Sequence, residues 1–312
     1  MTSTVGDLAI GVVAAGDAKR VAQLEAMPID SLWTGGHVAS TNPSTEAMVS
    51  LARLSAVTER VRVGTSILLL PLYAPAIVAK QIADLDNAAG GRIVLGVGVG
   101  GEYPQEFRAC QVPIEERGRR TDEAMGLIRR LWTAEEITHD GPFYAMEDVK
   151  VHPAPAQPGG PPIVVAGRKE PAMRRAALLG DGWMPYLYSA RRYAASAETI
   201  RAVAADAGRD LDDFAWYVWV FVNVDADGDR AREGAAQTMG GSYRQDFTQM
   251  VDNVAAAGTP DEVQRKLEAF VDAGARHFIF MPAAGRDGDP DRIVRALVQD
   301  VIPAARESVR AR

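Results

Sequence analysis

The sequence predicts an α/β protein, a (β/α)8 barrel that forms one domain over residues 1–312. Short Val- and Ile-rich runs alternate with longer segments of helical period along the whole chain. Several of these runs are apolar on both alternating faces, as strands of a parallel sheet covered by helices must be. The chain has eight of these Val- and Ile-rich runs in all, and eight strand–helix units make up one barrel. The length of 312 residues is compatible with this single large domain.

Eight segments are expected to be strands because they are short, apolar and bounded by turn residues. They are 8–14, 31–35, 61–67, 92–97, 162–166, 182–185, 214–224 and 276–281. Helices are expected at 17–27, 44–59, 75–88, 117–132, 169–180, 189–207, 227–256, 260–273 and 290–308. The seventh of these helices is expected to break at Gly240 and Gly241. The helix at 260–273 has the clearest start, because Thr259, Pro260 and Glu262 form a capping-box pattern.

Residues 133–162 interrupt this alternation between the fourth and fifth units. Six of the 18 prolines lie there, and Asp140–Gly141 is expected to form a turn between two short extended runs. We interpret the segment as an excursion from the barrel, because no linker-like stretch separates it as a second domain.

Charge and composition exclude several classes of function. With 41 acidic and 34 basic side chains the net charge is −7, which disfavours nucleic acid and anionic membrane surfaces as partners. The single cysteine excludes an intrachain disulfide framework, and four scattered histidines give no support for a metal site. Residues 1–7 do not resemble a secretory signal, and no run reaches the roughly 18 apolar residues of a membrane span. We therefore expect a cytoplasmic protein.

In a barrel, catalytic groups lie just after the strands. His37 follows the second strand beside two glycines, where its imidazole could act as a general acid or base, or simply bind loop backbone.

The third strand runs into GTSILLLP, which could form the wall of a binding site for a flat ligand or continue the core. The fourth strand leads through Gly98 and Gly100, whose bare backbone allows close approach of a ligand, to Glu102. Glu102 is the titratable group at that tip.

These glycines also match the dinucleotide-binding pattern G-x-G-x-x-G. The match follows the fourth strand rather than the first, Pro104 is expected to interrupt a helix start, and no acidic residue lies where the ribose needs one. A nicotinamide dehydrogenase is therefore the least favoured interpretation.

The turn after the fifth strand suggests an anion site. Ala166, Gly167, Arg168 and Lys169 place small residues and two cations where free N–H groups start a helix. The two cations could equally be ordinary surface residues. The residues by themselves thus indicate a barrel that binds an anionic, partly flat ligand, and they do not name a reaction.

Successive segments of the chain resemble the luciferase-like monooxygenase superfamily over nearly the whole length. They include SLWTGGHV, VRVGTSILLLPLY, GRIVLGVGVGGEYPQEF, ERGRRTDEAMGLIRRLW, HDGPFY, PPIVVAG, GDGWMP and GTPDEVQRKLEAFVDAGARHFIF. The resemblance implies a (β/α)8 barrel with an excursion between units four and five. It also implies an oxidoreductase that uses coenzyme F420 for hydride transfer or reduced FMN with oxygen.

The resemblance gives residues near the start of the chain specific roles. Ser66–Ile67 matches the family's non-prolyl cis peptide, which lies behind the flavin ring. His37 matches the histidine that takes a proton from the substrate alcohol in deazaflavin-dependent dehydrogenases of the family. That histidine follows an aspartate, which Gly36 replaces here.

Two later segments also acquire roles by resemblance. Glu102 resembles the acidic residue of the glycine-rich loop, displaced by one inserted glycine. Ala166 and Gly167 resemble the backbone site of the cofactor phosphate, with Arg168 as a candidate counter-ion.

The Ser–Ile pair, the position of His37 and the modest length favour the deazaflavin branch. We expect hydride transfer between coenzyme F420 and a small carbonyl, alcohol or imine. The alternatives are a two-component monooxygenase that receives reduced FMN from a separate reductase, and a non-catalytic flavin-binding barrel. The resemblance also implies a homodimer, because many family members pair through helices near the second and third strands.

Overall fold

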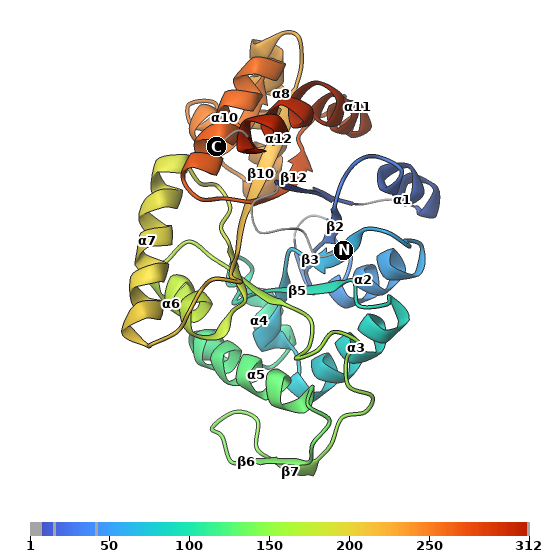
Figure 1. Cartoon of the computed structure of the whole chain (residues 1–312), viewed down its shortest axis with the longest axis vertical. Helices are drawn as coiled ribbons and strands as arrows, with labels where there is room; N and C mark the ends of the chain where they lie inside the picture. Colours follow the sequence, from blue (N-terminus) through green and yellow to red (C-terminus); the bar gives the residue numbers. More distant parts are fainter. Residues whose placement is uncertain (1–7, 15–16, 41–42, 311–312) are drawn as a thin grey trace. The chain divides into compact units, whose positions relative to one another are not determined.

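A computed structural model describes residues 8–14, 17–40 and 43–310 (Figure 1). Its contacts divide the chain into two compact units. Unit 1 contains the described residues of Met1–Ala14, Gln23–Ser31 and Trp183–Arg312. Unit 2 contains those of Ala15–Ala22 and Leu32–Gly182. The prediction about residues 1–7 lies outside the described residues, and the single domain remains a prediction.

Four parallel strands organise unit 2. In spatial order they are β2 (Ser31–Thr34), β3 (Arg62–Thr65), β5 (Ile93–Gly98) and β8 (Ile163–Ala166). Val63 pairs with Ile93, and Leu95 pairs with Ile163. The short strand β4 (Leu68–Leu69) pairs with the carboxyl end of β5. Every residue of β5 is buried, as expected for a strand that is covered on both faces.

Helices follow these strands. They are α2 (Ala47–Ala56), α3 (Pro75–Ala88), α4 (Pro104–Ala109), α5 (Arg117–Leu131) and α6 (Glu170–Leu179), with 3-10 turns at η1 (Leu70–Leu72) and η2 (Ile114–Glu116). The helix α1 (Ala18–Glu25) has residues in both units. The expectation that Pro104 interrupts a helix start is wrong, because Pro104 is the first residue of α4. Proline is tolerated there since the first N–H of a helix has no intrahelical acceptor.

The excursion contains the hairpin β6 (Ile137–His139) and β7 (Met146–Val149), whose antiparallel strands flank the predicted turn at Asp140–Gly141 (Figure 1). Glu123 of α5 holds this hairpin. Its Oε1 atom lies 3.1 Å from His139 Nε2 and accepts a hydrogen bond of 3.0 Å from Tyr144 N.

Unit 1 has parallel strands in the order β11 (Ala255–Gly258), β10 (Ala215–Val224), β12 (His277–Pro282) and β1 (Ala9–Val13), and β9 (Gly182–Met184) pairs with β10. Phe278 lies opposite both Ile10 and Val218, so β12 is bonded on each side. Across the two units, each of the eight segments predicted as strands contains a strand.

The helices of unit 1 are α7 (Ala190–Asp206), α8 (Gly228–Tyr243), α9 (Val251–Val254), α10 (Pro260–Asp272), α11 (Pro290–Ala296) and α12 (Ile302–Arg310). A π-helical turn, η3 (Leu297–Val301), joins α11 to α12. The capping box of α10 is confirmed, because Thr259 N donates to Glu262 Oε2 at 2.8 Å and Glu262 N donates to Thr259 Oγ1 at 3.4 Å.

The break predicted in the helix at 227–256 exists, but it follows Tyr243 rather than falling at Gly240 and Gly241. The helix α8 runs through Gly240 and Gly241 and ends before Arg244, which has a φ of 55°. Each glycine costs about 1 kcal/mol in a helix interior. The buried face of Ala231, Ala235 and Met239 outweighs that cost. Ala255 and Ala256, the last two residues of that predicted helix, belong instead to the strand β11.

Within the described ranges, no helix combines the length and apolar character that crossing a membrane requires.

Candidate active site in unit 2

His37 lies just beyond β2, at a point where two loops of unit 2 approach each other. Ser66 N donates to Thr34 O at 2.5 Å, which ties the end of β2 to the segment after β3. A Cβ atom on Gly35 would lie 2.7 Å from Ser66 O, and one on Gly36 would lie 1.8 Å from Thr45 O. Only glycine therefore fits at these two positions.

The imidazole of His37 is hydrogen-bonded to a buried carboxylate. Its Nδ1 atom lies 3.0 Å from Oε1 of Glu106, whose side chain is 1 % exposed compared with 30 % for His37. The other carboxylate oxygen, Oε2, accepts from Val38 N at 2.7 Å and from Ala39 N at 3.4 Å. Because an ionised carboxylate only accepts, this contact favours the neutral tautomer with the proton on Nδ1 and the lone pair on Nε2. No described residue is hydrogen-bonded to Nε2.

Two further contacts restrain the histidine. His37 N donates to Ser44 Oγ at 3.1 Å, which fixes its main chain. The ring of Tyr103 packs edge-to-face against the imidazole with 4.9 Å between the ring centres. His37 is thus held through its main chain, Nδ1 and one face of its ring.

Ser66–Ile67 is a cis peptide, so the geometry that the resemblance implied for this bond is confirmed. Ser66 Oγ is buried and has no hydrogen-bond partner among the described residues. Gly98 lies against Ile67, because a Cβ at position 98 would stand 2.0 Å from Ile67 Cδ1. The end of β5 and the cis segment therefore form one surface with an unsatisfied hydroxyl.

The loop after β5 has the backbone freedom that its glycines suggested. Gly100 has a φ of 63° and Gly101 a φ of 116°, values that other residues rarely adopt. Glu102 is exposed at the tip of this loop. The carboxylate that contacts His37 comes instead from Glu106, one helical turn further along the chain.

The turn after β8 leads from a buried strand end into α6. Ala166 is buried at the end of this strand, Gly167 has a φ of 140°, and Arg168 is half-buried. A Cβ on Gly167 would lie 2.5 Å from Ala172 Cβ, so only glycine fits the turn into α6. Lys169 is the N-cap of α6 and makes no side-chain cap hydrogen bond. Of the first three residues of this helix, Pro171 has no N–H and Ala172 N donates to Lys169 O at 2.9 Å, so the N–H of Glu170 is the one left for an anion.

These residues fit a cofactor that has a flat ring and a phosphate, such as F420 or FMN. Ser66 Oγ is a buried polar atom without a partner, and Gly98 provides bare backbone beside it. The start of α6 offers the N–H group of Glu170, two residues after Arg168. The sequence analysis placed residues of both parts in the cofactor site, and their role stays a prediction.

Sequence reasoning missed Glu106. A weak signal existed, because Pro104 is well suited to the first position of a helix, and a helix from Pro104 brings Glu106 and Phe107 onto the buried side. The partner of Glu106 could not be predicted, because 69 residues separate it from His37.

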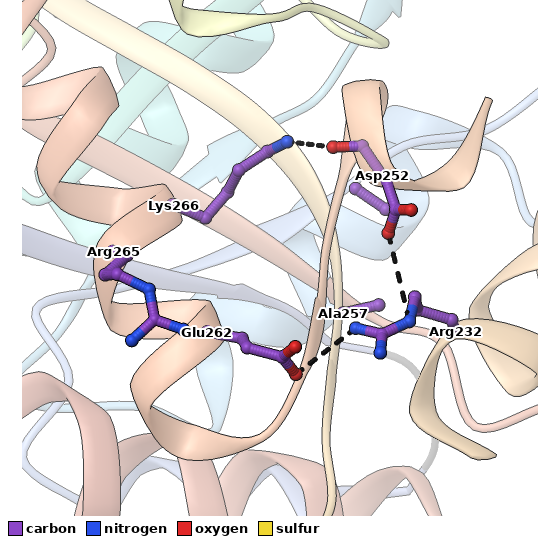
Figure 2. A pocket seen from close by; sticks show the side chains of 7 residues that line it. Arg232, Asp252, Ala257, Glu262, Arg265 and Lys266 are labelled. Atoms are coloured by element: carbon purple, nitrogen blue, oxygen red, sulfur yellow. Dashed lines mark hydrogen bonds and ion pairs between the residues drawn. The ribbon is translucent and has the colours of Figure 1, made fainter. Parts of the chain in front are cut away.

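A pocket lies in unit 1 between α8, β11 and α10 (Figure 2). Its volume is about 190 Å³, and its lining residues are Arg232, Asp252, Ala255, Ala257, Glu262, Arg265 and Lys266. Arg232 pairs with Glu262 at 3.2 Å and with Asp252 at 4.0 Å, and Lys266 Nζ donates to the main-chain oxygen of Asp252 (Figure 2). Burial lowers the pKa of Lys266. The charges largely satisfy one another, so we interpret this pocket as a structural ion-pair network.

Comparison with known proteins places the chain in a family. The model described as "Luciferase-like monooxygenase" matches residues 11–277. An uncharacterized protein of Mycobacterium tuberculosis is 42% identical over 142 residues, which cover 46% of this chain and 48% of the relative. The chain thus spans about half the length of that relative. An F420-dependent glucose-6-phosphate dehydrogenase of Amycolatopsis mediterranei is 28% identical over 315 residues, which cover 90% of this chain and 92% of the relative.

Solved structures share the fold. An F420-dependent secondary alcohol dehydrogenase in complex with an F420–acetone adduct has a TM-score of 0.85 at 20% identity, over 96% of this chain and 99% of the other. The oxygenating constituent of 3,6-diketocamphane monooxygenase from Pseudomonas putida, in complex with FMN, has a TM-score of 0.74 at 18% identity. The match covers 95% of this chain and 98% of the other. This likeness confirms the predicted fold class, an α/β barrel. With the match over residues 11–277, the chain belongs to the luciferase-like monooxygenase family of oxidoreductases.

Proposed function

We propose that this protein is a coenzyme F420-dependent oxidoreductase that transfers a hydride between the cofactor and a small carbonyl, alcohol or imine. The observation that carries the proposal is His37, which is held through Nδ1 while no described residue binds Nε2. An acid–base residue of this kind suits the interconversion of an alcohol and a carbonyl, which moves one proton with each hydride. The relationship over about 90% of the chain to an F420-dependent dehydrogenase supports the choice of cofactor.

Different residues would bind the ring and the phosphate of the cofactor. The Ser66–Ile67 segment and Gly98 would support the ring of the cofactor. Gly167, Arg168 and the N–H group of Glu170 at the start of α6 would hold its phosphate. When bound, coenzyme F420 supplies a hydride donor or acceptor at the ring carbon that replaces flavin N5.

His37 would handle the proton. During alcohol oxidation Nε2 accepts the hydroxyl proton as the hydride leaves the neighbouring carbon, and in the reverse direction it returns that proton to the carbonyl oxygen. Leu68, Leu69 and Leu70, which follow the cis segment, are buried and would exclude water on that side of the site. Glu102 is a second candidate acid because it is exposed at the tip of the adjoining loop.

A second candidate function is a two-component monooxygenase that takes reduced FMN from a separate reductase. The FMN-bound monooxygenase structure with the same fold favours it. The same glycine surface and helix start would accept the FMN ring and phosphate, so the residues described above do not separate the two cofactors.

Cofactor binding decides between them. The purified protein is titrated separately with F420 and with FMN, oxidised and reduced, while absorbance and fluorescence are followed. Tight binding of F420 and loss of its visible absorbance when a secondary alcohol is added are the expected results. Binding of FMN alone, with oxygen uptake that depends on reduced FMN, would overturn the F420 proposal.

The variant His37→Gln serves as the matched control. It should bind F420 like the wild type and lose turnover, since it removes the proton acceptor and leaves the ring site intact. Unchanged turnover would remove His37 from the mechanism. Binding without any turnover in the wild type would favour the non-catalytic barrel.

We further propose that the protein acts as a cytoplasmic homodimer. Val49 on α2 and Ile77 on α3 are 59 % and 56 % exposed, large values for apolar side chains. The double variant Val49→Glu, Ile77→Glu should be monomeric by light scattering. A monomeric wild type would contradict the proposal.

A further inference from the structure

We infer that Glu106 is a positioning residue for His37, and that it supplies from α4 the carboxylate that related dehydrogenases place directly before this histidine. The inference rests on the proposed function. It assigns a role to a residue that the sequence patterns did not indicate, and it explains how His37 can work beside Gly36.

Position 36 has no space for a carboxylate. A Cβ atom there would lie 1.8 Å from Thr45 O and 2.9 Å from Ala47 N, both main-chain atoms. Non-bonded carbon and oxygen atoms do not approach so closely. Any orienting carboxylate must therefore come from another element.

Glu106 reaches the histidine from such an element. Pro104 starts α4, and the next turn places Glu106 and Phe107 in the interior, each 1 % exposed. One oxygen of the carboxylate binds the imidazole of His37 at 3.0 Å. The other binds the main-chain N–H groups of Val38 and Ala39. Glu106 thus fixes both the ring and the backbone that follows it.

This arrangement has a chemical consequence for His37. The carboxylate requires the proton on Nδ1, which leaves the lone pair of Nε2 for the substrate. After His37 takes a proton, the adjacent negative charge stabilises the imidazolium. Glu106 would act through His37 in both steps, without touching the substrate.

A purely structural role would consist only of holding the loop at residues 37–39. The variant Glu106→Gln separates the two roles. Its amide oxygen can still accept from Val38 N and Ala39 N, so that its NH₂ group faces Nδ1 of His37. The NH₂ group donates, and it therefore favours the opposite tautomer, with the proton on Nε2.

The experiment measures the tautomer of His37 in the cofactor-free protein, by NMR with ¹⁵N-labelled histidine and His37→Gln for assignment. The wild type is expected to carry the proton on Nδ1, Glu106→Gln on Nε2, and Glu106→Asp on Nδ1. A wild type with the proton on Nε2, or the same tautomer in the wild type and Glu106→Gln, would overturn the inference. The wild-type result decides the matter even if Glu106→Gln fails to fold.

Turnover provides the second readout. With F420 and an alcohol, kcat of Glu106→Gln should fall by about 10²- to 10⁴-fold, the range that general acid–base catalysis contributes, with a shifted pH profile and partial rescue in Glu106→Asp. The control is Glu115→Gln, which removes an exposed carboxylate on η2 and should behave like the wild type. If the wild type does not turn over F420, the proposed function fails while the tautomer still tests Glu106.

Discussion

Gly98 packs against Ile67 so closely that a Cβ atom at position 98 would stand 2.0 Å from Ile67 Cδ1. The last residue of β5 and the second residue of the cis peptide thus share one surface. A methyl group at position 98 would therefore force the end of the Ile67 side chain to move.

The variant Gly98→Ala should displace Ile67 and weaken cofactor binding by about tenfold or more. Overpacking typically costs about 1–3 kcal/mol in free energy of unfolding. Cofactor titration and urea denaturation measure the two effects. The matched control is Gly126→Ala in α5, where a Cβ would meet nothing within 4 Å, so this variant should be stabilised by up to about 1 kcal/mol. Wild-type affinity in Gly98→Ala would show that this surface does not contact the cofactor.

An aspartate at position 36, where related dehydrogenases have one, should not raise the activity of this protein. Gly36→Asp would force the main chain at Thr45 to move, so we expect lower stability and lower kcat than in the wild type. Thermal unfolding and steady-state turnover test this expectation. Gly241→Asp is a suitable control, since a Cβ there has open space. Higher activity in Gly36→Asp would mean that the loop adapts and that Glu106 is dispensable.

Arg168 should matter only for cofactors that carry a phosphate. Arg168→Gln is expected to weaken binding of FMN or F420 by about 10- to 100-fold, since a hydrogen bond to a charged group contributes about 1.5–3 kcal/mol. Binding of riboflavin, or of the deazaflavin without its phosphate, should not change. Lys169→Gln, which changes the neighbouring exposed cation, is the control. An equal loss for the phosphate-free ligands would contradict the assignment.

Lys266 should give a measurable pH dependence of stability. Burial lowers its pKa in the folded state below the usual 10.5, so the unfolded chain binds more protons between the two values. This group therefore makes stability rise with pH through that window. Lys266→Met removes this titration. The free energy of unfolding of the variant minus that of the wild type should therefore be larger near neutral pH than at about pH 10. Urea denaturation at both values tests this, with the exposed Lys19→Met as control. An identical difference at both pH values would refute it.

The sequence was sufficient to predict the barrel because each of its eight strands has a local apolar pattern. It was not sufficient for β11, since the residues AAAG have no β-branched side chain and become a strand only through pairing of Ala255 with Phe221. It also placed the break of the seventh helix at Gly240, whereas α8 continues to Tyr243, with Met239 buried in the turn that contains Gly240.

The same distinction between local pattern and tertiary contact applies to the candidate site. His37, Ser66 and Gly98 were found because motifs along the chain carry them. Glu106 was not, because its contact with His37 depends on tertiary structure, which no local pattern encodes.

The position of Glu106 also affects how such proteins are recognised. A search for histidine preceded by aspartate passes over this chain, although a buried carboxylate lies 3.0 Å from the imidazole. A search defined by atoms in space, a carboxylate oxygen beside Nδ1 of the histidine after the second strand, would find it. Family members that lack the adjacent aspartate can be sorted by this geometry into those that have moved the carboxylate to another element and those that have lost it.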